Sequence, residues 1–199
     1  MQNTFLSEEP ARNAPGPKPA KKLYSIPALL RDRTFAGQFE TSTGSYEFTY
    51  APHSARLSKG KLELTGSLNI GAAGGAKHEV RNVRATLAAT QGGIYGAPAA
   101  IVARLRSTTS SLPITESTGP LGFVGVMYFR LSPINASAAG LNIDLSSVQL
   151  NARLAPLSDT EREMQVIFSD LVAAAYGPQP NLSEAGRHLT ALNRLLGQA

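Results

Sequence analysis

Few residues in this chain are able to do acid–base or metal chemistry. Cysteine is absent, and the histidines are His53, His78 and His188. No two of these histidines have a spacing typical of a metal site, such as four residues along a helix. His53 and His78 fall near the ends of predicted strands, so a shared metal or catalytic site between them is an open alternative. The sequence otherwise predicts no catalytic residue, no metal and no cofactor.

Nucleophilic catalysis has little support in the pattern. A Ser/His/Asp arrangement would have to use Asp32 or Asp144, and the chain has no nucleophile-elbow motif. The strand carboxylates Glu47 and Glu63 lie on the polar sides of their strands, where a strongly raised pKa is not expected. The sequence therefore favours a binding protein over an enzyme.

The net charge of +5 is distributed unevenly, because most basic residues precede residue 108. A basic face for nucleic acid or an anionic surface is one interpretation, and a solvated outer face is the other. A nucleic-acid site needs aromatic rings on the same face as the charges, whereas Tyr46, Phe48 and Tyr50 lie on the opposite side of their strand. The candidate basic face consists of Arg56, Lys59, Lys61, Arg81, Arg84, Arg104 and Arg106.

Residues 61–70 must form a strand that helps to position these side chains. Apolar and polar residues alternate strictly there, which is typical of a strand with one face on a core and one in water. Lys59-Gly60 predicts the tight turn of a hairpin, and Pro52 is expected to end the preceding strand over 46–50. The apolar members of the central strand are Leu62, Leu64, Leu68 and Ile70.

Further strands follow in the same manner. The strand from about residue 78 to 90 changes parity between Val80 and Val83, which predicts a β-bulge at Arg81-Asn82. A strand over 101–105 would point Arg104 and Arg106 outward. Residues 123–131 are apolar on both faces, so this strand should be covered on both sides. Two alternating strands are predicted at 141–145 and 148–154.

The two ends of the chain differ in character. Residues 1–22 are rich in Pro, Ala and Lys and predict a disordered tail. Ser25 ahead of Pro27 predicts a short helix over 25–30. Capping boxes at 158–161 and 181–184 start two amphipathic helices, which we expect to cover the strand at 123–131 over Val124, Val126 and Tyr128. The alternative is that the last helix packs on another subunit and makes a homo-oligomer.

The predicted fold class is α+β. Roughly eight mainly antiparallel strands form a curved sheet or barrel, and the two C-terminal helices pack on it. The tail occupies 1–22, the antiparallel β domain 23–157, and the helical pair 158–199 belongs to the same domain.

Residues 61–93 resemble the central hairpin of the YceI-like family. The resemblance rests on Leu62-Glu63-Leu64-Thr65-Gly66-Ser67-Leu68-Asn69-Ile70, followed through a glycine turn by Val80, Val83 and Leu87. That family comprises bacterial, lipocalin-like barrels that bind polyisoprenoids or other long apolar ligands. The resemblance implies a barrel with an apolar interior, and it transfers no ligand residue. The family's opening strand is not recognisable before Thr34, and the two C-terminal helices are additional.

The function predicted from the sequence is non-enzymatic binding of an apolar, lipid-like ligand or of a protein partner. The alternatives are a nucleic-acid or anionic-surface binder and a structural assembly subunit. No membrane-spanning helix is predicted. Because the N-terminus has no apolar export signal, we expect a cytoplasmic location, or a periplasmic one if a leader has been removed.

Overall fold

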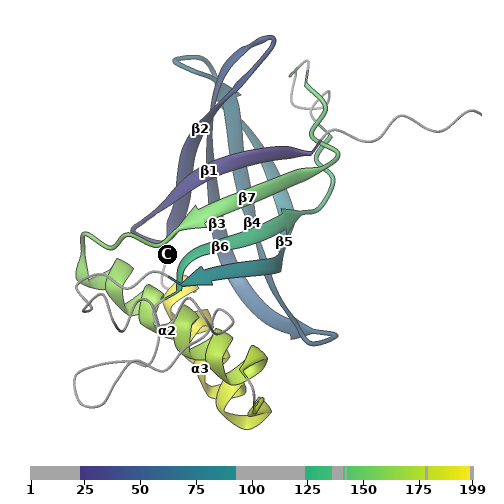
Figure 1. The fold of residues 1–199 in the computed structure, drawn as a ribbon. Helices are drawn as coiled ribbons and strands as arrows, with labels where there is room; N and C mark the ends of the chain where they lie inside the picture. Colours follow the sequence, from purple (N-terminus) through teal and green to yellow (C-terminus); the bar gives the residue numbers. More distant parts are fainter. Residues whose placement is uncertain (1–22, 93–123, 136–140, 142, 178, 198–199) are drawn as a thin grey trace, which may run out of the picture.

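The structure is a computed structural model, and it describes residues 23–92, 124–135, 141, 143–177 and 179–197 (Figure 1). The predicted tail at 1–22 and the predicted strand at 101–105 lie outside these residues. The described strands are β1 (Tyr24–Arg31), β2 (Thr34–Thr41), β3 (Gly44–Ser58), β4 (Lys61–Ala72), β5 (His78–Gly92), β6 (Val124–Leu131) and β7 (Val148–Arg153). They are followed by the helices α2 (Asp159–Tyr176) and α3 (Leu182–Leu196).

The strands close into a barrel in which each one pairs with the next and β7 returns to β1. Neighbouring strands are antiparallel except β1 and β7, which run parallel from Tyr24 opposite Val148 to Leu29 opposite Arg153. The predicted α+β class, with a mainly antiparallel barrel and two C-terminal helices, is confirmed. Seven strands are present in the described part of the chain, against roughly eight predicted.

The strand directions define two ends of the barrel. The turns from β1 to β2 and from β3 to β4 lie at the end that carries α2 and α3, which we call the helix end (Figure 1). The turns from β2 to β3 and from β4 to β5 lie at the opposite end, together with the connection from β6 to β7. We call this opposite end the far end.

The β3–β4 hairpin follows the predicted pattern closely. Lys59 and Gly60 adopt φ angles of 50° and 73°, as a two-residue hairpin turn requires. Along β4, burial alternates from Leu62 to Ile70, so the strand has one face on the core.

Two β-bulges interrupt the ladders that β4 forms with β3 and β5. Between Val80 and Val83, two residues of β5 oppose the single Ser67 of β4, which confirms the bulge predicted at Arg81-Asn82. Asn82 has a φ angle of 57°, a left-handed conformation that asparagine tolerates better than most residues.

The second bulge corrects a prediction, because β3 continues through Pro52 to Ser58. Pro52 pairs with Gly66 and Ser54 with Thr65, which leaves His53 as the extra residue. A bulge interrupts the ladder, so a proline without an N–H group is tolerated there. A Cβ on Gly66 would lie 2.2 Å from the Ala51 carbonyl oxygen, so the close approach of the two strands requires glycine.

The short helix predicted over residues 25–30 is wrong, because these residues belong to β1. Ile26, Ala28 and Leu30 are buried and alternate with outward residues. Pro27 occupies an outward position opposite Asn151 of β7. The helical signals of Ser25 and Pro27 are local, whereas the pairing with β7 comes from the other end of the chain and prevails over them.

The strand predicted at 141–145 is also wrong. The described residues of this segment form a single isolated bridge between Ile134 and Leu145. Both side chains are buried in the core, at 6% and 1% exposure, so they anchor the β6–β7 connection at the far end. The alternation of apolar residues reflects this anchoring rather than a ladder.

β1 and β2 diverge beyond a short corner. They pair only from Leu29–Ala36 to Arg31–Thr34. A Cβ on Gly37 would lie 2.1 Å from the Pro27 carbonyl oxygen and 2.8 Å from Cε1 of Phe48. Glycine is therefore needed where β1 crosses close to β2, and the Phe48 ring covers the space that a side chain would fill.

Aromatic side chains fill the barrel interior. Phe35 of β2 is fully buried, and its ring centroid lies 6.2 Å from that of Phe129 on β6 and 6.5 Å from that of Phe168 on α2. Tyr50 is also fully buried, and its hydroxyl donates to the Val83 carbonyl oxygen at 3.1 Å. Burial raises the pKa of Tyr50 above its ordinary value.

Both predicted helix starts are confirmed. The side chains of Ser158 and Asn181 accept hydrogen bonds from the amides of Glu161 and Glu184, at 3.2 Å and 3.1 Å. The helices lie at the helix end of the barrel rather than over its wall (Figure 1).

The predicted cover of β6 is correct only for Val124, whose N–H donates to Ser169 Oγ at 3.0 Å. Val126 and Tyr128 are half-buried on the outer wall. The short connection after β7 delivers α2 to the end of the barrel, which explains the difference. The last helix, α3, packs on its own barrel through Asn193 and Ala55, as expected if the helices cover the sheet.

Asn193 is the polar anchor of α3. Its side chain accepts from the Ala55 N–H at 2.7 Å and donates to the Ala55 carbonyl oxygen at 2.9 Å, on a part of β3 beyond its pairing with β2. Because Asn193→Ala leaves both backbone groups without this partner, we expect it to lower the free energy of unfolding by about 1–3 kcal/mol. The neighbouring, exposed Arg194→Ala should change it by less than about 0.5 kcal/mol. Urea unfolding of both variants measures the difference, and equal midpoints would contradict the anchoring role.

Candidate functional site

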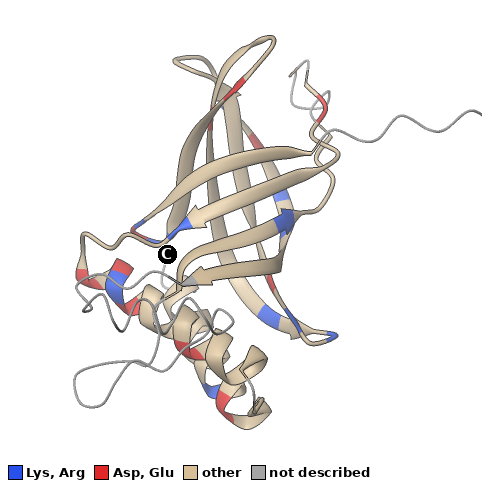
Figure 2. Cartoon of the chain, viewed as in Figure 1, with Lys and Arg blue, Asp and Glu red and all other residues tan. Residues whose placement is uncertain are grey.

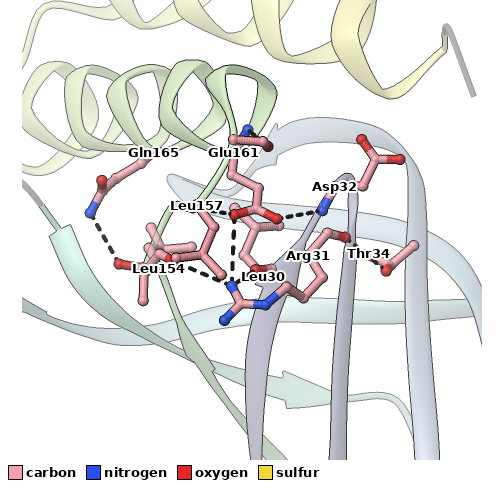
Figure 3. Close-up of polar contacts among 10 residues, drawn as sticks. Leu30, Arg31, Asp32, Thr34, Leu154, Leu157, Glu161 and Gln165 are labelled. Carbon is pink, nitrogen blue, oxygen red and sulfur yellow. Dashed lines mark hydrogen bonds and ion pairs between the residues drawn. The ribbon is translucent and has the colours of Figure 1, made fainter.

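A cluster of buried and partly buried polar groups lies where α2 meets the strand ends at the helix end (Figure 3). Glu161 is only 4% exposed, and its carboxylate accepts from the Asp32 N–H at 2.9 Å and from the Leu157 N–H at 2.6 Å. Arg31 Nη1 lies 3.7 Å from the same carboxylate and donates to the carbonyl oxygens of Leu30 and Ala155. The cluster thus ties the β1–β2 turn to the start of α2.

The polar row continues along α2 at intervals of four residues. Gln165 donates to the carbonyl oxygens of Val124 and Leu154, both at 3.2 Å. Ser169 donates to the Gln165 carbonyl oxygen and accepts from Val124 N–H. We call Glu161, Gln165 and Ser169 the α2 polar row. It satisfies backbone groups at the ends of β1, β6 and β7, which would otherwise be buried without partners.

The row is built for structure rather than for catalysis. Burial opposes ionisation of Glu161, but the hydrogen bonds from Leu157 and Asp32 and the charge of Arg31 hold its pKa below the usual value. An ionised carboxylate has no proton to donate to a substrate, and backbone N–H groups already occupy both oxygens that would accept one. The Asp32 residue is exposed and contributes its backbone N–H rather than a catalytic side chain.

A second titratable group lies between the helices. Burial raises the pKa of Asp170 on α2, His188 lowers it and Glu184 raises it. His188 Nε2 lies 3.8 Å from Glu184 Oε1, one turn earlier on α3. In the part of the chain that the structure describes, no three His, Asp or Glu side chains gather closely enough to hold a metal ion.

His53 and His78 do not meet. His78 pairs with Ile70, which pairs with Phe48, and His53 lies further along β3 in the bulge after Pro52. Both histidines are exposed. A site shared between them is therefore excluded by the register.

The candidate basic face is divided by the structure. Arg56 and Arg81 form ion pairs with Glu63 and Glu79, at 2.7 Å and 3.0 Å. Lys59 and Lys61 are exposed at the β3–β4 turn, and Arg84 is exposed on β5. Arg104 and Arg106 lie outside the described residues. The hydrogen bond from Arg81 lowers the pKa of Glu79, so this carboxylate is ionised beside its partner.

The interior of the barrel is apolar at the far end. The rings of Phe39 and Tyr46 stack with centroids 5.5 Å apart, and the Tyr46 hydroxyl lies 3.1 Å from Thr43 Oγ1. Ile134 and Leu145 of the β6–β7 connection are buried in the same core cluster. Further apolar side chains of this cluster are only partly buried; at the far end they are Tyr24, Val80, Leu141 and Ile143.

The α2 polar row is not among the sites predicted from the sequence. Its signal is the spacing of Glu161, Gln165 and Ser169, which puts three polar residues on the side of α2 that also carries Met164 and Phe168. A polar residue repeated every four positions within an apolar stripe indicates backbone groups that need partners.

Comparison with protein-family models, with curated proteins and with solved structures gives no match. The resemblance to the YceI-like family stays a prediction. In a separate observation, no helix among the described residues is long and apolar enough to cross a bilayer.

Proposed function

We propose that the protein is a non-enzymatic binding protein whose barrel holds an apolar, lipid-like ligand at its far end. The composition of the interior supports this proposal. Among the described residues, the buried strand side chains are all apolar or tyrosine, and the three buried polar side chains belong to the α2 polar row. A lining of this kind suits an apolar ligand and offers no group for chemistry.

The far end is the best position for the ligand. Seven strands make a narrow barrel, whose interior side chains can fill. The Phe35 ring follows the β1–β2 turn at the helix end and contacts the rings of Phe129 and Phe168, so it fills the interior on that side. At the far end, Tyr24 and Val80 pack on the core but are only partly buried, so apolar surface there is accessible to a ligand.

A polyene fatty acid whose fluorescence rises in an apolar environment tests the proposal. We expect saturable binding, and we expect Val80→Glu to weaken it by at least about tenfold, because a charge is costly beside an apolar ligand. Val126→Glu is the matched control, since Val126 is also half-buried but lies on the outer wall. It should leave fatty-acid binding unchanged.

Circular dichroism must show that both variants are folded, and Val80→Trp provides a second, uncharged probe of the same position. Absence of binding by the unmodified protein, or equal loss in the Val80 and Val126 variants, would contradict the proposal. Native mass spectrometry of the purified protein adds the ligand mass and the subunit number in one spectrum. A retained protein in place of a small molecule would favour the protein-partner alternative.

A further inference from the structure

The outer wall formed by the part of β5 after Asn82 and by β6, β7 and β1 carries basic, amide and aromatic side chains without acidic ones. β1, β6 and β7 contain no Asp or Glu, and β5 contains none after Glu79 at its start. We call this wall the acid-free face. Its principal outward residues are Gln91, Tyr128, Arg130, Gln149, Asn151 and Arg153.

The strand register gathers these residues around Tyr128. Asn151 lies directly opposite Tyr128, and Arg130, opposite Gln149, is two residues further on β6. Arg153 lies opposite Val126, diagonally from Tyr128 on the other side. With strands about 4.8 Å apart and residues of one face about 7 Å apart along a strand, both guanidinium groups reach the surroundings of the Tyr128 ring.

The two arginines have no carboxylate partner. Arg130 and Arg153 are exposed, and neither takes part in an ion pair among the described residues. The wall formed by β3, β4 and the start of β5 differs, because Glu47, Glu63 and Glu79 each form an ion pair with a basic residue there. Figure 2 shows the contrast, with blue but no red along the β6 and β7 ribbons.

The Tyr128 ring lies across the wall. Its hydroxyl is 3.0 Å from Gln91 Oε1, although Tyr128 pairs with Ala89 and Gln91 pairs with Val126. To reach Gln91 diagonally, the ring must lean over the small Ala89 side chain and along the sheet. The helices contact β6 at Val124, at the helix end, and leave Tyr128 partly exposed.

Hydrogen bonds order the amides between the strands. Asn151 Nδ2 donates to Ser25 Oγ at 2.7 Å, and Gln149 Nε2 donates to Asn151 Oδ1 at 3.0 Å. A flat aromatic ring, unpaired arginines and neutral amides on one sheet surface are the components of a site that stacks bases and binds phosphates. Arg84 lies at the margin, since it is exposed two residues before Thr86, the partner of Arg130.

We propose that the acid-free face binds single-stranded nucleic acid, with a base on Tyr128 and phosphates at Arg130, Arg153 and Arg84. This function is separate from the ligand at the far end, because the two sites lie on the outside and inside of the barrel wall. Sequence specificity is not part of the proposal, since stacking and phosphate contacts are sequence-tolerant.

Fluorescence anisotropy with a labelled single-stranded oligonucleotide of about 20 nucleotides, long enough for a single binding module, tests the proposal over a range of salt concentrations. Three phosphate contacts predict a log–log salt slope of about −2, and Arg130→Gln with Arg153→Gln should reduce it to about −0.7. Tyr128→Leu should weaken binding about 5- to 100-fold with little change in slope, because it removes a stacking platform but no charge.

Arg56→Gln with Arg81→Gln is the matched control, since it removes the same net charge from the ion-paired wall. We expect this pair to retain the affinity and the slope of the unmodified protein. Equal loss of affinity in both double variants would overturn the proposal in favour of a net-charge effect. The proposal would also be overturned if the Arg130 and Arg153 changes left the affinity unchanged, or if no binding were detected at 50 mM salt. Vesicles of phosphatidylglycerol form the last arm. Vesicle binding that depends on Arg130 and Arg153, without oligonucleotide binding, would instead identify an anionic membrane surface.

Discussion

Replacing Phe35 with alanine is expected to lower the free energy of unfolding by about 3–5 kcal/mol, the range measured for buried phenylalanine truncations. Phe35 is fully buried, and its ring joins β2 to Phe129 of β6 and to Phe168 of α2. Because the barrel closes around this ring, we expect the cavity left by its removal to collapse little. A loss of this size is a large fraction of the total stability of about 5–15 kcal/mol typical of a domain.

Urea unfolding measures the Phe35 effect, and two further variants calibrate it. Leu182→Ala is the control on an exposed apolar residue, with 71% exposure, and should change the stability by less than about 0.5 kcal/mol. Phe35→Leu keeps most of the volume and should cost less than the alanine variant. Similar midpoints for Phe35→Ala and Leu182→Ala would contradict the central position of this ring.

Removal of the Glu161 carboxylate is expected to have the second largest effect. Glu161→Ala leaves the N–H groups of Asp32 and Leu157 without their acceptor, and at about 1–3 kcal/mol for each buried donor the loss is about 2–6 kcal/mol at pH 7. Glu163→Ala, two residues along the same helix and exposed, is the control and should have little effect.

The stabilisation of the folded protein by Glu161 should decrease as the pH is lowered. Its pKa in the folded protein is below the value of about 4.5 expected for an unfolded glutamate, so folding favours the ionised form. The stabilisation is therefore complete well above pH 4.5 and is lost as the pH falls through the folded pKa. We expect the stability difference between the unmodified protein and Glu161→Gln to shrink on acidification. A constant difference between pH 7 and pH 3 would show that the charge of Glu161 has no part in docking α2.

Local patterns predict the hairpins and helices of this chain well. β4 is predictable because its alternation is complete, the Lys59-Gly60 turn because glycine suits a positive φ angle, and both helices because of their capping residues. The bulge in β5 is predictable because the parity of its valines changes within one strand. In each case the decisive interaction joins residues close in the sequence.

Features that depend on distant pairing are not predictable in this way. Ser25 and Pro27 suit a helix start as well as an outward strand face, and only β7 decides between them. The outward position of Tyr128 beside Asn151 depends on the register of β6 with β7, so the acid-free face cannot be recognised from the sequence alone. The candidate basic face could be listed from the sequence, but the ion pair of Arg56 with Glu63 depends on the register of β3 with β4. The pair of Arg81 with Glu79 is local, because it joins residues two apart on β5.

The parallel contact between β1 and β7 has a consequence for folding kinetics. Ser25 and Asn151, which bond across this seam, are 126 residues apart in the sequence. Pairing at such a separation has a large loop-closure entropy and raises the contact order, which slows folding. During synthesis the hairpins from β2 to β5 can form as they emerge, whereas β1 must wait for β7. Until then the edges of β1 and β2 are open to pairing with other chains, so misassembly and recognition by chaperones should be concentrated in this interval.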